Sequence, residues 1–182
     1  NLVRQMILTK SDEERSSIIE RLLPIQKEDF IDLFKEMSNL PVTIRLLDPP
    51  LHEFLPNSQQ EIQRTANLMA ITEQQLADRI KDLSEFNPML GTRGVRLGVM
   101  VPEIYDMQVQ AIFLAAIEVF KKYKIAVNPE IMIPLISANK EVDLVRDRIR
   151  KVFSQLNKNN FVDLKYKLGV MVETPRAALR AG

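Results

Sequence analysis

The apolar run from Val42 to Leu47 constrains the fold of this chain more than any other stretch. Short runs of aliphatic and β-branched residues are typical of buried strands. Arg45 interrupts the run near its carboxyl end, and Asp48-Pro49-Pro50 follows as a turn. An unpaired guanidinium in a buried strand costs several kcal/mol, so Arg45 must meet an anion. That anion is either a carboxylate of this chain or a bound ligand, and the residue alone does not choose between them.

Composition excludes several classes of protein. The chain has 182 residues, the size of one domain, and its 46% hydrophobic and 27% charged residues suffice for a core and a polar surface. The net charge of +1 argues against general binding to nucleic acid or to anionic membranes. No apolar run reaches the roughly 20 residues of a membrane span. The absence of cysteine excludes disulfides and thiol chemistry within these residues.

Both ends of the sequence suggest a piece of a longer protein. The first residues, Asn1 to Leu8, begin without methionine and lack the apolar core of a signal peptide. At the other end, a predicted strand–helix unit stops within its helix at Gly182. We therefore expect an internal fragment, and in the absence of any targeting segment we expect a cytoplasmic protein.

Helix signals dominate the first part of the chain. Ser11 and Glu14 form a capping box that opens a helix, and Pro24 is expected to break it. A second helix carries an apolar stripe over residues 30–37. Further on, a helix over 59–70 and another that Thr72 and Gln75 cap are expected to form a helical insertion between strands.

Apolar strands and amphipathic helices alternate in the rest of the chain. The predicted elements are the longest helix over 102–123, a strand over 130–137 that Pro134 shortens or places at an edge, a helix over 140–156, a strand over 168–173 and a helix that starts at Thr174-Pro175. Such alternation is typical of parallel βαβ architecture, in which the chemistry lies at the carboxyl ends of the strands. Arg45, Arg93 and Glu173 all fall at or near such ends.

The segment from Asn87 to Gly98 is a second candidate anion site. It contains three of the five glycines of the chain and two arginines, Arg93 and Arg96. Glycine lets the backbone come close to a ligand, and guanidinium groups bind anions. The alternative is a tight turn with solvated arginines. The anion site is favoured because the segment repeats the arrangement of an arginine near a strand end.

Three motifs resemble the pyruvate phosphate dikinase family, in its phosphoenolpyruvate-binding barrel. They are the segments 43–54, 87–97 and 169–179. The first of them contains the sequence Asp-Pro-Pro-Leu-His-Glu-Phe. Where the family often has histidine, cysteine and valine, this chain has Thr92, Val95 and Thr174. These departures flank the functional positions without replacing them, and the similarity spans essentially the whole chain.

The resemblance implies an α/β fold, a partial TIM (β/α)8 barrel with helical insertions. Residues 1–182 would be roughly the first half of the phosphoenolpyruvate/pyruvate-binding domain, with about four of the eight strands. The family's enzyme is an ATP-binding transferase. It interconverts ATP, phosphate and pyruvate with AMP, pyrophosphate and phosphoenolpyruvate, and a phosphohistidine on a separate domain carries the phosphoryl group.

By this resemblance, Arg45 and Arg93 hold the phosphoryl group in transfer, and Glu173 contacts substrate and is a ligand of Mg²⁺. The family's proton-donating cysteine and its phosphohistidine are absent from this chain, so it contains no catalytic residue and should be inactive alone. The one histidine, His52, is expected to be scaffold. Arg96 and Arg176 are expected to be ion-paired neighbours of the site.

The implied partners are phosphoenolpyruvate or pyruvate, the phosphohistidine domain, and further copies of the chain through strand edges that the missing half of the barrel would cover. Nucleic acid and membranes are not expected. Phosphoenolpyruvate synthase and enzyme I of the sugar phosphotransferase system share the barrel and remain alternatives, although the segment 48–54 favours the dikinase. A helical interaction module is the non-enzyme alternative. It does not explain charged residues at the ends of apolar strands.

Overall fold

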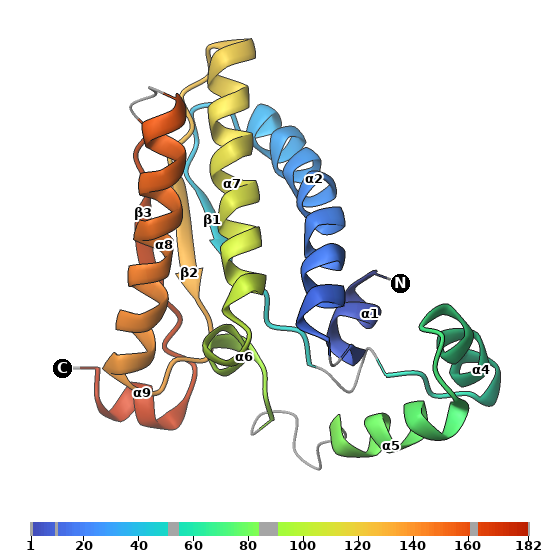
Figure 1. Ribbon diagram of the computed structural model, residues 1–182. Coiled ribbons are helices and arrows are strands. Elements are labelled where there is room, and N and C mark those ends of the chain that lie inside the picture. Colours follow the sequence, from blue (N-terminus) through green and yellow to red (C-terminus); the bar gives the residue numbers. More distant parts are fainter. Residues whose placement is uncertain (1, 10, 51–54, 84–90, 161–163, 182) are drawn as a thin grey trace. The chain divides into compact units, whose positions relative to one another are not determined.

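The computed structural model describes residues 2–9, 11–50, 55–83, 91–160 and 164–181. The chain divides into two compact units, which are Asn1–Ile18 with Pro49–Arg93, and Ile19–Asp48 with Gly94–Gly182. We call the first the helical unit and the second the sheet unit. Their elements are labelled in Figure 1. His52, expected to be scaffold, lies outside the described residues.

A parallel sheet organises the sheet unit. Its strands are β1 (Val42–Arg45), β2 (Pro129–Ile133) and β3 (Lys167–Val170), in the order β1-β2-β3. Ile44 lies opposite Ile131, which lies opposite Leu168. The predicted parallel architecture is therefore confirmed, and Pro134 does end β2 early. The described residues contain three strands rather than about four, since the chain enters a helix directly after Arg93. Three strands do not close a barrel.

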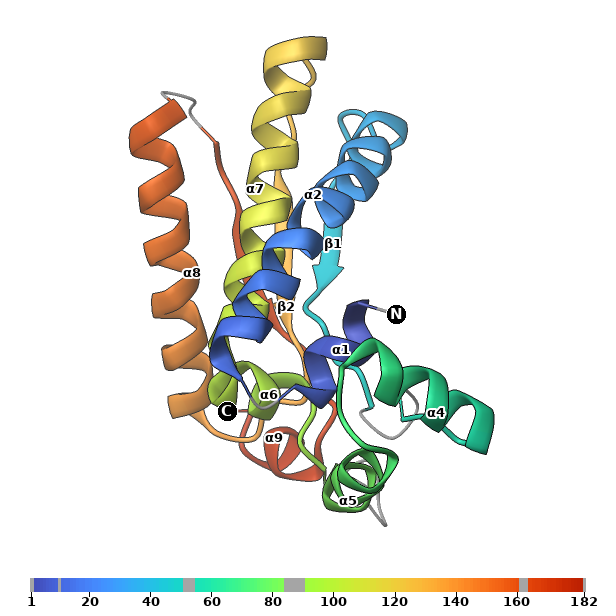
Figure 2. The ribbon, with the colours of Figure 1, turned by 45° about the vertical axis from the view of Figure 1, so that its right-hand side comes forward.

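Helices cover one face of this sheet (Figures 1 and 2). They include α7 (Pro102–Tyr123) and α8 (Asn139–Asn160). In β1, Val42 and Ile44 are buried whereas Thr43 and Arg45 are exposed, so the strand has one covered and one open face. This alternation follows from the two-residue period of a strand, which points successive side chains to opposite faces.

The core between sheet and helices is apolar and aromatic. Ile131, Ile133 and Ile112 are almost fully buried. Phe113 of α7 meets Phe153 of α8 edge-on at a centroid distance of 5.2 Å. Such edge-to-face pairs contribute beyond the area that they bury. The helix predicted over 102–123 is confirmed at both ends, with Pro102 in its first turn.

One continuous helix, α2 (Asp12–Glu36), replaces the two that were expected. With 25 residues it, and not α7, is the longest helix described. Pro24 lies inside it, so the predicted break is wrong. Leu22 on one side of the proline and Phe34 on the other are both buried. Burying such side chains is worth about 1.5–3 kcal/mol each, which together offsets the roughly 3 kcal/mol cost of an internal proline.

The helical unit contains α1 (Leu2–Leu8), α4 (Gln59–Leu68) and α5 (Glu73–Leu83). The predicted capping box of α5 is present: the amide of Gln75 donates to Thr72 Oγ1 at 3.1 Å, and the amide of Thr72 donates to Gln75 Oε1 at 3.0 Å. Leu8, Leu55, Ala66 and Leu76 form a small core. The short α1 was not predicted.

The sheet unit also contains α6 (Gly94–Met100) and α9 (Pro175–Leu179). No helix within the described ranges is long and apolar enough to span a bilayer.

An ion pair links α2 to α7. Lys27 Nζ of α2 lies 2.5 Å from Glu118 Oε2 of α7, and Lys122 Nζ lies 2.5 Å from Glu118 Oε1. Hydrogen bonds from the two lysines lower the pKa of Glu118 to about 2. Because this pKa is depressed on folding, the pair stabilises fully above the unfolded pKa of about 4.3. The stabilisation is lost as the pH falls toward 2.

We expect Glu118→Gln to lower the free energy of unfolding by less than about 1 kcal/mol at pH 7, because the pair is close to solvent. The difference from wild type should shrink as the pH falls from 5 toward 2, where the native carboxylate is protonated too. Urea denaturation at each pH measures it. Glu20→Gln is the control, since Glu20 is exposed on α2, the helix that carries Lys27. A Glu118→Gln difference that does not change with pH would contradict the assignment.

Candidate functional site

The carboxyl edge of the sheet brings together charged residues that are far apart in the sequence. Arg45 is the last residue of β1, and Glu173 follows the end of β3. Arg45 Nη2 lies 2.8 Å from Glu173 Oε1, although 128 positions separate the two residues. The same nitrogen lies 2.8 Å from Asp48 Oδ2. Two of the three predicted site residues are therefore neighbours, together with an aspartate that sequence reasoning treated only as part of a turn.

Arg45 reaches this site from the open face of the sheet. Its side chain is 36% exposed, although the sequence places it in an apolar run typical of a buried strand. Burial lowers the pKa of Arg45, but the hydrogen bond from its guanidinium to Glu173 and the charge of Asp48 outweigh that effect and raise the pKa above its ordinary value. The guanidinium therefore stays charged. In this structure the anions that it meets are carboxylates of the chain itself.

Backbone groups also hold Glu173. The amide of Leu135 donates to Glu173 Oε1 at 2.8 Å. Leu135 has φ = +55°, a left-handed conformation that is uncommon for a leucine and persists where the surroundings impose it. Thr174 caps α9 by accepting a hydrogen bond from the amide of Ala177, as the sequence predicts, and its own hydroxyl donates to the carbonyl of Ile136. Hydrogen bonds thus hold both the carboxylate of Glu173 and the residue that follows it.

Gly94 leaves the space that the carboxylate of Asp48 occupies. Its φ is +54°, and a Cβ there would lie 2.9 Å from Leu135 Cβ and 3.2 Å from Asp48 Oδ1. A larger residue would be strained and crowded. The glycine-rich segment was expected to be a loop up to Gly98, but α6 begins at Gly94. The part from 87 to 90 lies outside the described residues. The sequence analysis singled out the glycines of this segment because glycine allows close approach to a ligand. The structure shows that Gly94 is needed for packing within the chain.

Arg93 belongs to the helical unit and Arg45 to the sheet unit. Arg93 is half-buried, and its amide donates to the carbonyl of Gly91 at 3.0 Å. That Arg45 and Arg93 together hold the phosphoryl group stays a prediction. Arg96 is half-buried within α6. Arg176 is exposed in α9 and forms no ion pair with any residue that the structure describes, so the expected pairing of Arg176 is not observed.

The carboxylate of Glu173 fits one position in a magnesium site. Its side chain is 26% exposed, and both observed contacts are made by Oε1. Mg²⁺ usually takes one or two carboxylates from a protein and completes its shell with water and substrate oxygens. No group of three or more aspartate, glutamate, histidine or cysteine residues gathers within the described ranges. Among the described residues, Glu173 is the ligand that the sequence analysis predicted, and its role in binding Mg²⁺ stays a prediction.

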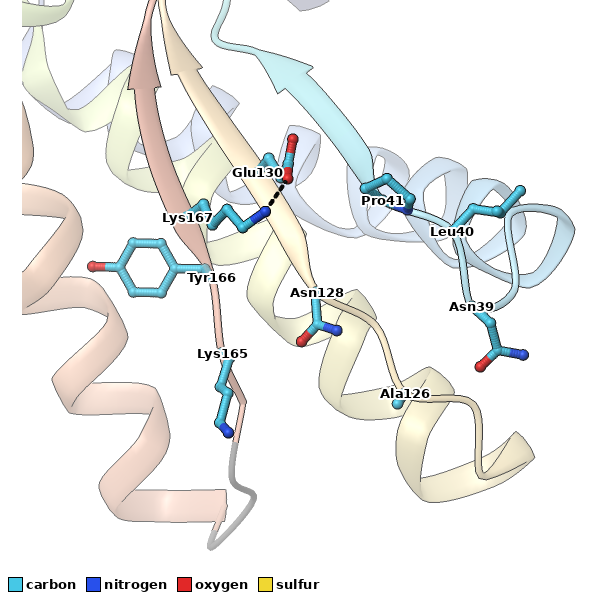
Figure 3. A pocket seen from close by; sticks show the side chains of 9 residues that line it. All are labelled: Asn39, Leu40, Pro41, Ala126, Asn128, Glu130, Lys165, Tyr166 and Lys167. Carbon is cyan, nitrogen blue, oxygen red and sulfur yellow. Dashed lines mark hydrogen bonds and ion pairs between the residues drawn. The ribbon is translucent and has the colours of Figure 1, made fainter.

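A cavity of about 590 Å³ lies at the opposite end of the strands of the sheet unit (Figure 3). Residues just before each strand line it, among them Pro41, Asn128 and Lys165. Within it, Glu130 accepts a hydrogen bond from Thr43 Oγ1 at 2.7 Å and pairs with Lys167 Nζ at 2.9 Å.

These contacts tie the three strands together, and they lower the pKa of Glu130, through Lys167 first and Thr43 second. In parallel α/β folds the chemistry occurs at the carboxyl ends of the strands. The cluster of Arg45, Asp48 and Glu173 is therefore the better candidate.

Comparison with known proteins places this geometry in a family. Residues 2–182 match the family described as PEP-utilising enzyme, PEP-binding domain, where PEP is phosphoenolpyruvate. The chain is 48% identical over 181 residues to the pyruvate, phosphate dikinase of Rhizobium meliloti and 44% identical over 179 residues to that of Clostridium symbiosum. It is 46% identical over 181 residues to pyruvate, phosphate dikinase 2 of rice. These alignments cover 98–100% of this chain but only 20% of each relative.

Proposed function

Because the chain belongs to the PEP-utilising enzymes and matches their PEP-binding domain, we propose that it is part of a pyruvate, phosphate dikinase. In this proposal its residues form part of the site for phosphoenolpyruvate and pyruvate. The observation that carries the proposal is the contact of Arg45 with Glu173 at the carboxyl edge of the sheet, in a chain 44–48% identical to proteins named for this activity. The chain spans a fifth of their length, so the activity is that of the longer protein.

The proposed reaction interconverts ATP, phosphate and pyruvate with AMP, pyrophosphate and phosphoenolpyruvate. A phosphohistidine on another domain would carry the phosphoryl group to this site. Three neighbouring parallel strands in chain order, with one open face, support completion of a (β/α)8 barrel by residues outside this chain. Phosphoenolpyruvate synthase and enzyme I of the sugar phosphotransferase system use a similar site, and the names of the relatives favour the dikinase.

In the proposed mechanism, the guanidinium of Arg45 binds the phosphoryl group that moves between the carrier and pyruvate. A guanidinium fork matches phosphoryl oxygens, and its fixed charge stabilises the charge that spreads over them in the transition state. Arg93 would bind the same group from the segment before α6. Glu173 would hold Mg²⁺, which when bound polarises the enolate oxygen of pyruvate. The open face leaves Arg45 accessible to the substrate.

The experiment that tests the function uses the full-length protein and three assays. A dikinase forms AMP and pyrophosphate from ATP only when both phosphate and pyruvate are supplied. A synthase forms AMP and phosphate from ATP, pyruvate and water without pyrophosphate. Enzyme I takes its phosphoryl group from phosphoenolpyruvate and needs no nucleotide. Formation of pyrophosphate that depends on phosphate is the expected result, and either of the other patterns would replace the proposal by that alternative.

Glu173→Gln is expected to weaken the binding of Mg²⁺ and to slow the half-reaction with pyruvate by roughly 10²-fold, because a neutral amide is a poor ligand for a hard cation. The ATP-dependent phosphorylation of the carrier histidine should be unchanged. Calorimetric titration with Mg²⁺ and rapid-quench assays of each half-reaction measure these effects. Glu130→Gln removes a carboxylate at the far end of the same sheet and should change neither. An unaltered affinity for Mg²⁺ in Glu173→Gln would remove Glu173 from the metal site.

Location and assembly form part of the proposal. We propose that the enzyme works in the cytoplasm, although pyruvate, phosphate dikinase 1 of rice is named chloroplastic, so a plastid is the alternative in a plant. We also propose that it is a homo-oligomer. Sedimentation of the full-length protein at micromolar concentration tests the latter, and a single monomeric boundary would contradict it.

A further inference from the structure

Arg45 is shared by two carboxylates that differ in their surroundings. Asp48 Oδ2 and Glu173 Oε1 each lie 2.8 Å from Arg45 Nη2. The side chain of Asp48 is only 1% exposed, while that of Glu173 is 26% exposed. Asp48 therefore contacts the arginine from the protein side, and Glu173 contacts it from the side that solvent and ligands can reach.

Neighbouring residues determine where the side chain of Asp48 lies. Gly94 leaves room for the carboxylate, since a Cβ there would lie 3.2 Å from Asp48 Oδ1. One residue before Asp48, the amide of Leu47 donates to Gln108 Oε1 of α7 at 2.7 Å, and Gln108 is itself buried. A buried carboxylate in such a seat is stable as an ion only when it is paired, and removing one partner of a buried pair is strongly destabilising. Asp48 and Arg45 thus hold each other in place.

Glu173 has a second task under the proposed function, because it would also bind Mg²⁺. A carboxylate that coordinates a cation interacts less strongly with a neighbouring guanidinium, because the metal ion draws negative charge from the carboxylate and repels the positively charged guanidinium. If Glu173 alone oriented Arg45, binding of the metal would loosen the arginine just when the phosphoryl group needs it. Asp48 is too buried to leave Arg45 in the same way.

We propose that Asp48 is a positioning residue, which keeps the guanidinium of Arg45 in the site while Glu173 exchanges Arg45 for the metal ion. The proposal rests on the proposed function, and it adds a residue that acts through Arg45 without touching the substrate. It also explains why Arg45 pairs with two carboxylates. The arginine is held on one side by a permanent partner and on the other by one that it can release.

The test is Asp48→Asn in the full-length enzyme, which keeps the shape of the side chain and removes its charge. With Asp48 neutral, Arg45 has Glu173 as its remaining charged partner in this cluster and competes with the metal for it. Binding of Mn²⁺ in place of Mg²⁺, measured without substrate, is expected to weaken about tenfold. The KM for phosphoenolpyruvate should rise, and kcat/KM of that half-reaction should fall roughly 10²-fold, as expected for a misplaced binding group. The ATP-dependent half-reaction should not change.

The direction of the KM change separates positioning from simple charge removal. Deleting a negative charge near an anionic substrate would by itself lower the KM for phosphoenolpyruvate, whereas loss of the oriented arginine raises it. Tyr105→Phe is the matched control. Tyr105 is buried, and its burial first and the charge of Asp48 second raise the pKa of its phenol. Its hydroxyl has no hydrogen-bond partner among the described residues. The control should leave both half-reactions and the affinity for Mn²⁺ unchanged.

An unchanged or lower KM for phosphoenolpyruvate in Asp48→Asn would overturn the positioning role. So would an equal loss of both half-reactions with a lower melting temperature, because that result assigns Asp48 to stability alone. Failure of the proposed function is recognised separately, since the wild-type protein would then form no pyrophosphate in a reaction that depends on phosphate and pyruvate.

Discussion

Replacing Arg45 by alanine is expected to slow the half-reaction with pyruvate and phosphoenolpyruvate by roughly 10³-fold, which is the usual effect of removing an arginine or an oriented donor from a phosphoryl or oxyanion site. The physical reason is that its guanidinium, held 2.8 Å from both Asp48 and Glu173, is already oriented before substrate binds. ATP-dependent phosphorylation of the carrier histidine should proceed at the wild-type rate, because that chemistry occurs on other domains. Single-turnover measurements of the two half-reactions give the comparison.

Arg45→Lys is the companion variant. It keeps the positive charge next to the buried Asp48 but loses the planar fork that binds two oxygens at once. We expect an intermediate rate, below wild type and above Arg45→Ala. The lysine variant also guards against misfolding, since Arg45→Ala removes a cation from the buried carboxylate of Asp48, and breaking a buried pair costs about 3–5 kcal/mol. Equal loss of both half-reactions in both variants would mean that Arg45 serves the fold and not the phosphoryl group.

The second large effect concerns stability. Gly98→Ala is expected to destabilise the sheet unit by about 2 kcal/mol or more, in the range measured for overpacked cores. A Cβ on Gly98 would lie 2.3 Å from Tyr105 Cε2 and 2.4 Å from Cδ2, and the ring of Tyr105 is only 2% exposed. The ring cannot move aside without displacing α7. The sign of the change in stability is informative, because alanine within a helix otherwise stabilises a protein by about 1 kcal/mol relative to glycine.

Gly169→Ala provides a matched control with the same chemical change. Gly169 lies in β3, and a Cβ there would have no atom within 4 Å. We expect its effect to stay within about 0.5 kcal/mol, as for substitutions that touch nothing. Hydrogen exchange of the α7 amides in the full-length protein reports the free energy of opening for both variants. Equal protection in the two would show that the ring of Tyr105 yields at little cost.

Local signals predicted the elements whose ends are set by neighbours in the chain. The caps at Thr72 and Thr174 and the proline at the start of α7 were all read from the sequence, because the hydrogen bonds that they make span only a few residues. Local rules failed at Pro24. The expectation that proline breaks a helix considers only the lost hydrogen bond and the steric clash. The apolar stripe on both sides of Pro24 is buried against the rest of the fold, and this burial favours a continuous α2.

The sequence by itself determined that Arg45 and Glu173 belong to one edge of a parallel sheet, because strand periodicity and βαβ alternation place residues at strand ends, and the motifs indicated the family. Only the tertiary structure decided what each residue contacts. The pairing of Arg45 with Glu173 joins positions 128 apart. The space for the carboxylate of Asp48 depends on Gly94, which comes from another segment. The open face of β1 depends on which elements cover the sheet. Each of these is a relation between distant segments, and no pattern within a few residues of Asp48 encodes the space that surrounds its carboxylate.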